Sequence, residues 1–156
     1  MFLPHNNLRV GGFVLGLALF GLSCDGGLAP ANNDSPAILS GTIMYSGTWP
    51  DVSEVQDLRF VALRFVPEDT ADFLQLNRLE ASNSLRYGVQ SDTFVIRNIE
   101  PGLFPFNGVA RRKTADLLSW SPLGLYLAND GIIELDAGDS IHVEMMVDLD
   151  NPPDFP

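Results

Sequence analysis

The most regular pattern in the chain is the alternation over positions 140–149, in which an apolar set alternates with Ser140, His142, Glu144, Met146 and Asp148. Its apolar members are Ile141, Val143, Met145, Val147 and Leu149. Because successive side chains of a strand point to opposite faces, this pattern predicts a strand with one buried and one solvated face. Residues 39–45 alternate in the same way, with Leu39, Ile43 and Tyr45 on the face expected to be buried.

Other short apolar segments are separated by turn residues. Residues 58–66 are almost continuously apolar, which predicts a central strand covered on both faces, with Arg59 and Arg64 leaving it at its ends or at a bulge. Further strands are expected over residues 85–89, 93–99, 104–111, 123–127 and 132–135. About seven to eight short strands and no long helix predict an all-β fold, an antiparallel β-sandwich.

The segment 68–84 fits two interpretations. Phe73, Leu76 and Leu79 have helical spacing, and Thr70 could cap a short helix there. A long loop is equally compatible with its composition. The sequence leaves this choice open.

The N-terminus carries an export signal. Arg9 precedes a fourteen-residue apolar run, residues 10–23, which is shorter than the roughly 18 residues needed to span a bilayer. The run ends at Cys24, the one cysteine of the chain, and residues 21–24 resemble a lipobox with the small Ser23 before the cysteine. Acylation would account for a thiol that has no disulfide partner within the chain. Ordinary signal-peptide cleavage after Ala31 is the alternative.

The N-terminal signal and the pattern of strands together predict four parts along the chain. They are a lipoprotein signal peptide over 1–23, a flexible tether over 24–37, a β-sandwich domain over 38–150 and a C-terminal tail over 151–156. The tether is rich in Gly, Pro, Asn and Asp and has almost nothing to bury. We therefore expect an exported protein of the bacterial cell envelope, held on the membrane by a lipid at Cys24, on the periplasmic or outer-membrane side.

The net charge of the chain argues against one class of partner. The whole chain has a formal charge of −11, and removal of Arg9 with the signal peptide makes it −12. Such a surface repels nucleic acid and anionic membrane surfaces. A nucleic-acid-binding role is therefore not expected.

Three segments resemble a known family. Residues 40–43 (Ser-Gly-Thr-Ile), residues 99–106 with the turn Pro101-Gly102, and the closing alternating strand resemble transthyretin-like (prealbumin-like) sandwiches, among them the carboxypeptidase regulatory-like domains of bacterial envelope proteins. The resemblance covers residues 38–149. It implies a β-sandwich with an accessory or binding role and no catalytic residue. The turn 46–51 and the segment 68–84 depart from the family pattern.

Motifs for catalysis or metal binding are missing from the sequence. His142, the one histidine after the signal peptide, lies on the polar face of the last predicted strand, and neither a G-x-S-x-G nor an H-E-x-x-H motif occurs. We therefore expect no enzymatic activity, no cofactor and no metal. Two acidic clusters, 130–139 and 148–154, raise calcium as an alternative, although neither has the spacing of an EF-hand loop.

Candidate binding residues come from two features. Arg111, Arg112 and Lys113 form the only basic cluster, which is either an anion site or a strand end balanced by nearby acids. Trp49 and Trp120, expected in loops, could stack on a sugar or a protein partner, or could plug the ends of the sandwich. The sequence thus favours a non-enzymatic binding or structural module with an envelope protein or glycan as partner. The alternative is a carbohydrate-binding module that uses Trp49, Trp120 or Tyr126, and a hydrolase is the least favoured class.

Overall fold

The computed structural model describes residues 35–154, and these consist of β-strands joined by loops and short 3-10 turns. The strands are β1 (Ala37–Ser46), β2 (Asp57–Leu63), β3 (Leu79–Ala81), β4 (Ser91–Ile99), β5 (Gly102–Phe104), β6 (Phe106–Arg112), β7 (Trp120–Leu125), β8 (Ile133–Leu135) and β9 (Ser140–Asp148). The turns are η1 (Val52–Glu54), η2 (Thr70–Leu74), η3 (Leu76–Arg78), η4 (Leu117–Ser119) and η5 (Ala128–Gly131). None of the helical segments in this range is long and apolar enough to cross a bilayer. The all-β prediction is confirmed. The signal peptide, Cys24 and the alternative cleavage site at Ala31 lie outside the described residues.

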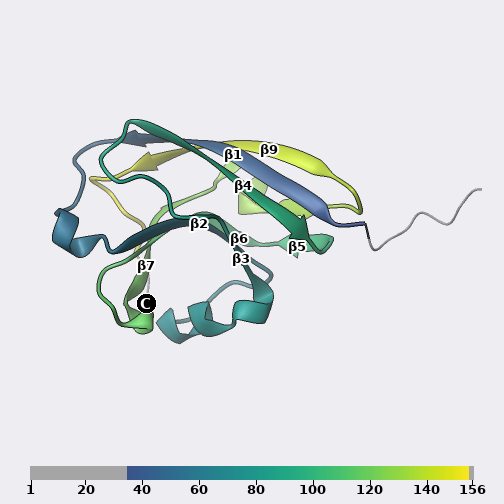
Figure 1. Cartoon of the computed structure of the whole chain (residues 1–156), viewed down its shortest axis with the longest axis horizontal. Helices are drawn as coiled ribbons and strands as arrows, with labels where there is room; N and C mark the ends of the chain where they lie inside the picture. Colours follow the sequence, from purple (N-terminus) through teal and green to yellow (C-terminus); the bar gives the residue numbers. More distant parts are fainter. Residues whose placement is uncertain (1–34, 155–156) are drawn as a thin grey trace, which may run out of the picture.

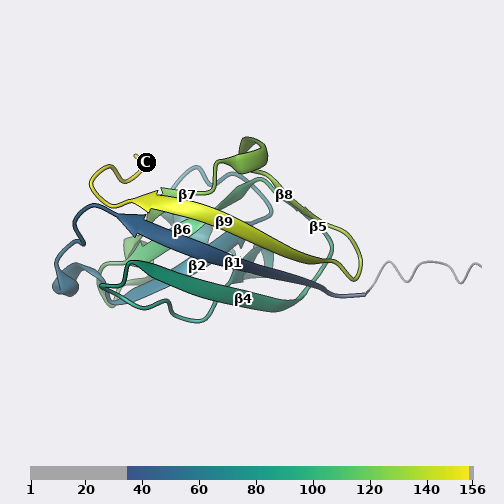
Figure 2. The same cartoon turned by 90° about the horizontal axis from the view of Figure 1, so that it is seen from above.

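The strands form two main sheets and one small one. One main sheet has the order β4-β1-β9 and the other the order β3-β2-β6-β7, while β5 pairs with β8. The first lies over the second, and its three strands run side by side (Figures 1 and 2).

The pairing of β1 with β9 corrects the prediction of an antiparallel arrangement. These strands are parallel in register from Ile38 opposite Ser140 to Ser46 opposite Asp148, whereas the other strand pairs are antiparallel. Almost the whole domain separates β1 from β9 along the chain, so no hairpin forces them to run in opposite directions. Alternation predicts which face of a strand is buried, but says nothing of its direction.

The main core lies between the two large sheets. Phe60 of β2 stacks on Phe94 of β4, with ring centroids 4.0 Å apart. The Phe94 ring also lies over Gly41 of β1, where a Cβ atom would approach the ring to 2.5 Å. The predicted buried face of the last strand is confirmed, since Val143, Met145 and Val147 belong to this core. Apolar burial between the sheets therefore holds them together.

Strand β2 is covered on both faces, as its continuous apolar sequence predicts. Leu58, Phe60 and Ala62 pack into the main core, while Val61 and Leu63 belong to a second cluster on the other side of the sheet. The strand ends at Leu63 and not at Val66. There Arg64 turns to donate hydrogen bonds to the backbone carbonyls of residues 100 and 101.

Three local expectations were wrong. Residues 85–89 form a loop and not a strand, because the backbone N–H and guanidinium of Arg86 bind the carboxylate of Asp92. The cap of η2 is Asp69 and not Thr70, since the Asp69 carboxylate accepts hydrogen bonds from two backbone N–H groups of that turn. Trp120 lies in β7 and not in a loop.

The domain begins slightly earlier than expected. Ala37 is fully buried at the start of β1, so the strand starts inside the range predicted as tether. Before it, the carbonyl of Ser35 accepts a hydrogen bond from the N–H of Gly138.

The register of β9 can be tested by truncation. Val143→Ala should lower the free energy of unfolding by about 1–3 kcal/mol, because it removes buried apolar surface and leaves a cavity. His142→Ala, on the exposed face of the same strand, should change it by less than about 0.5 kcal/mol. Urea denaturation of both variants is the measurement. A larger loss for His142→Ala would mean that the strand faces the other way.

Candidate functional site

The outer face of the sheet β3-β2-β6-β7 carries an apolar pocket of about 230 Å³. Strands β2, β3 and β7 and the turns η2, η3 and η4 contribute its apolar lining: Val61, Phe73, Leu76, Leu79, Ala81, Leu117 and Trp120. This volume exceeds the roughly 150 Å³ of a protein cavity that takes up benzene, and lies below the ~300 Å³ at which sites for drug-sized ligands begin. The pocket therefore fits one aromatic ring or one branched alkyl group.

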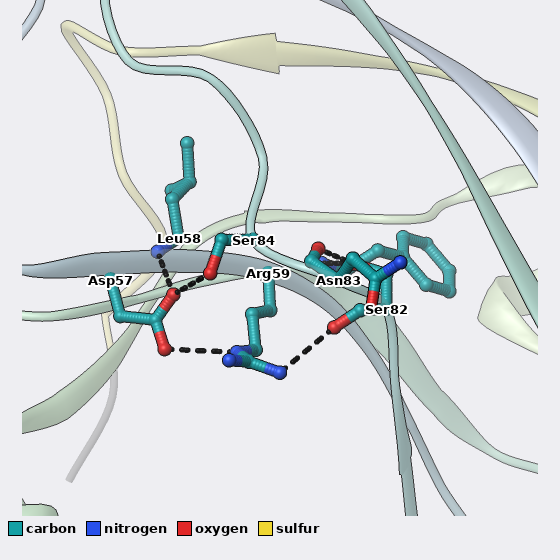
Figure 3. A network of polar contacts seen from close by, with 7 residues as sticks. Asp57, Leu58, Arg59, Ser82, Asn83 and Ser84 are labelled. Carbon is teal, nitrogen blue, oxygen red and sulfur yellow. Dashed lines mark hydrogen bonds and ion pairs between the residues drawn. The ribbon is translucent and has the colours of Figure 1, made fainter.

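Asp57 and Arg59, which line the pocket, belong to a charged network. Figure 3 shows this network. The carboxylate of Asp57 accepts hydrogen bonds from the N–H of Leu58, the hydroxyl of Ser84 and Nε of Arg59, at 3.0, 2.7 and 2.9 Å. Nη1 of Arg59 donates to the carbonyl of Ser82 at 3.1 Å. The buried Ser82 hydroxyl in turn accepts a hydrogen bond from the N–H of Phe60. The network fixes the segment after β3 against the start of β2.

This network determines what Asp57 can do. Burial alone would raise the pKa of its carboxyl, but the hydrogen bonds from Ser84 and Arg59 and the positive charge of Arg59 hold the pKa below its usual value. The carboxylate is therefore ionised at neutral pH, with both oxygens accepting hydrogen bonds. Such a group is poorly suited to act as a general acid or base.

Arg112 and Trp120 lie beside the network of Asp57 and Arg59 on the same sheet. Asp57 of β2 lies opposite Arg112 of β6, which lies opposite Trp120 of β7, so the three side chains share one face of the sheet. The Arg112 guanidinium is 5.9 Å from the centroid of the Trp120 ring. Within the described residues Arg112 makes no ion pair, and its buried Nε has no hydrogen-bond partner.

The other two residues of the basic cluster, Arg111 and Lys113, differ in their ion pairing. The side chain of Arg111, only 12% exposed, pairs with Glu54 at 3.4 Å, as expected for a strand end balanced by a nearby acid. Lys113 is exposed and has no ion pair within residues 35–154. An unbalanced positive charge therefore remains at Arg112 and Lys113.

Trp49 lies elsewhere and has a different environment. Its ring is 4.6 Å from that of Tyr45 and 5.1 Å from that of Tyr87, and its indole N–H donates to the carbonyl of Val89. It packs on the main core, whereas Trp120 packs on the second cluster across the sheet. These contacts favour the plug interpretation for Trp49. Tyr126 is buried, which removes it as a sugar platform.

Two of the three candidate segments meet at one end of the strands, those of Arg112 and Trp120. The N–H of Gln56 donates to the carbonyl of Arg112, and Glu54 pairs with Arg111, so η1 and the start of β2 lie beside the end of β6. Within this end, Arg112 and Trp120 come together, but Trp49 does not join them.

Three further hollows surround Tyr126, with volumes of about 340, 380 and 210 Å³. Two of them are larger than the apolar pocket, and all three are somewhat more open to solvent. The one charged residue lining each is an acid, respectively Glu134, Asp130 and Glu144. We therefore place the candidate site at the pocket beside Trp120.

The remaining polar candidates have local structural roles. The His142 ring is hydrogen-bonded to the hydroxyls of Ser40 and Thr42, at 3.1 and 3.3 Å, on the exposed face of β9. In the acidic clusters, Asp150 accepts a hydrogen bond from the N–H of Thr48, and Asp139 from that of Asp136. No group of three His, Cys, Asp or Glu side chains suited to a metal occurs in the described part of the chain.

Sequence reasoning missed most of the pocket. Phe73, Leu76 and Leu79 have helical spacing in the sequence, but that spacing does not show that they meet Leu117 and Trp120 in space. The available signal was the presence of several large apolar residues in segments too irregular to be strands.

Comparisons with known proteins return no match, whether to family models, to curated proteins or to solved structures. The functional proposal therefore rests on the site itself.

The lowered pKa of Asp57 predicts how the stability of the protein depends on pH. A carboxyl whose pKa is lowered by folding stabilises the protein above its unfolded-state pKa of about 4, and this contribution disappears as the pH falls through the lower folded-state pKa. Asp57→Asn should therefore lower the free energy of unfolding at pH 7 by about 1–2 kcal/mol, since charge-assisted hydrogen bonds are weakened. The variant should also lose less stability than wild type between pH 7 and pH 3.

Denaturation with urea at the two pH values measures this difference. Asp130→Asn is the control, since Asp130 is exposed and has no ion pair among residues 35–154. An equal loss of stability in Asp57→Asn and wild type on acidification would contradict the described role of Asp57.

Proposed function

We propose that this protein is a non-enzymatic binding module of the bacterial cell envelope, exported and held on the membrane by a lipid at Cys24. Its folded domain is a transthyretin-like β-sandwich. The two large sheets over a shared core support this assignment, as does the turn at Pro101-Gly102, which joins β4 to β5. The apolar run that ends at Cys24 supports export and lipidation.

The apolar pocket beside Trp120 is the observation on which the binding role rests. The turns that cover β2 leave this pocket open, and Leu76 and Leu117 in its lining are 72% and 54% exposed. Leu74 and Leu118 are exposed close by in the sequence. Exposed apolar surface around a pocket is typical of a protein interaction site.

A protein partner suits the side chains present. Trp and Arg are the residue types most often responsible for binding energy at protein interfaces, and Trp120 and Arg112 stand together at this site. The one carboxylate that lines the pocket, Asp57, has a lowered pKa and is hydrogen-bonded through both oxygens, which makes it a weak general base. We therefore assign the pocket to partner binding and not to catalysis.

Carbohydrate binding is the second candidate. Trp120 with the guanidinium groups of Arg59 and Arg112 resembles the aromatic platform and polar donors that a sugar needs. The mostly apolar lining offers few partners for sugar hydroxyls, and Trp49 and Tyr126 are engaged elsewhere. This makes a glycan the weaker candidate.

Lipidation can be tested on the intact protein. The membrane-extracted mature chain should begin at Cys24 and carry a lipid adduct in its intact mass, and Cys24→Ala should release the domain or block processing. A mature N-terminus at Asn32 without an adduct would contradict the anchor and support ordinary cleavage after Ala31.

Partner binding can be tested by photo-crosslinking in cells. A photoreactive amino acid at Leu117 should give a specific crosslinked product with an envelope protein. The same group at Val95, which is 45% exposed on β4 of the other sheet, is the matched control. Identical products from both positions, or none from Leu117, would argue against this surface as the binding site. Loss of the product after treatment with a glycosidase would instead support the glycan candidate.

A further inference from the structure

The charges around the apolar pocket are unevenly balanced. At its edge Asp57 is already neutralised by Arg59, and on the other face of the sheet Arg111 is neutralised by Glu54. Arg112 lies directly opposite Asp57 in the ladder, yet makes no ion pair with it. Both oxygens of Asp57 already accept hydrogen bonds, one from Leu58 and Ser84 and the other from Arg59. The positive charge of Arg112 therefore remains available.

The environment of Arg112 prepares it to bind an anion. Its Nε is buried, and its guanidinium lies near the Trp120 ring, so the base of the side chain is already ordered against the sheet. A carboxylate from a partner would reach the terminal nitrogen atoms, which have no partner among the described residues. Less side-chain freedom is then lost on binding than for an extended surface arginine.

We propose that the pocket recognises a segment of a partner protein in which one large apolar side chain stands next to an acidic residue. The apolar side chain, aromatic or branched, occupies the pocket against Trp120, and the neighbouring carboxylate binds Arg112. This inference rests on the proposed function and adds the chemistry of the partner to it.

Size and charge both support this partner. The pocket of about 230 Å³ takes one large side chain, and the exposed leucines beside it would remain uncovered by a small free acid. The chain as a whole has a charge of −11 and repels acidic partners. An acidic residue is therefore accepted only beside an unpaired cation, and Arg112 is such a cation, opposite the lining residues Asp57 and Trp120 in the sheet. Specificity then has two sources: the net negative charge of the domain repels acidic partners over most of its surface, and Arg112 attracts an acidic residue at the pocket.

Short synthetic peptides test this recognition directly. The probes are acetylated, amidated hexapeptides with Asp-Phe or Phe-Asp at the centre of a Gly/Ser sequence, and matched peptides in which Asn or Lys replaces Asp, or Ala replaces Phe. Affinity is measured from amide and indole shifts in ¹H–¹⁵N NMR spectra of the lipid-free domain, residues 25–156, whose first folded strand begins at Ala37. An Asp peptide should bind about 3- to 5-fold more tightly than its Asn counterpart, the effect of one partly exposed charge pair, and a Lys peptide more weakly still.

Variants assign the preference to one side chain. Arg112→Gln should reduce the preference for Asp over Asn to less than about 2-fold, because the charge pair is gone. Arg97→Gln, an exposed arginine on β4 of the other sheet, should leave the preference unchanged.

The outcomes separate the two proposals. Equal affinity for Asp, Asn and Lys peptides, with shifts still centred on Trp120, would overturn acid recognition and leave the pocket as a binding site. Equal affinity for Phe and Ala peptides would overturn the apolar anchor. Peptide shifts that avoid Trp120, together with no specific crosslink at Leu117, would overturn the proposed function as well.

Discussion

Strand β2 is apolar on both faces, and the rest of the structure is arranged to bury both of them. One face packs against the sheet β4-β1-β9, where regular strands interlock well, as the stacked rings of Phe60 and Phe94 show. The opposite face, with Val61 and Leu63, has no second sheet above it and is covered by short turns. Because such turns match a sheet surface less closely than strands do, the cover is incomplete, and the apolar pocket is the space that remains.

The charges gather where this cover ends. Asp57, Arg112 and Trp120 occupy the last cross-strand row of the sheet, next to the border of the pocket. Asp57 is committed to Arg59 and to the segment after β3, so that network stabilises the fold and leaves Arg112 unpaired. The Asp57–Arg59 ion pair thus leaves the positive charge of Arg112 unbalanced, and we assign that charge to partner recognition. The Asp57 carboxylate therefore links the stability of the fold to partner binding.

Much of the fold could be predicted from the sequence, because burial of one face or of both leaves a periodic pattern. The alternation of β9 and the continuous apolar run of β2 predicted their environments correctly. The parallel direction of β9 could not be predicted, since alternation is the same in either direction. Residues 85–89 have strand-like composition but are held in a loop by Asp92, and that hydrogen bonding is specific to the folded structure. The site was predicted only at Trp120 and Arg112, because the rest of the pocket comes from irregular turns that meet in space.

The loop-covered face of β2 should be an open binding pocket in solution. Intermolecular nuclear Overhauser effects between the domain and toluene, a probe of the size that the pocket admits, measure this. We expect contacts from toluene to the side chains of Val61, Leu79 and Trp120. Contacts confined to the hollows around Tyr126, or none at the three named side chains at saturating toluene, would show that this face is closed and does not bind.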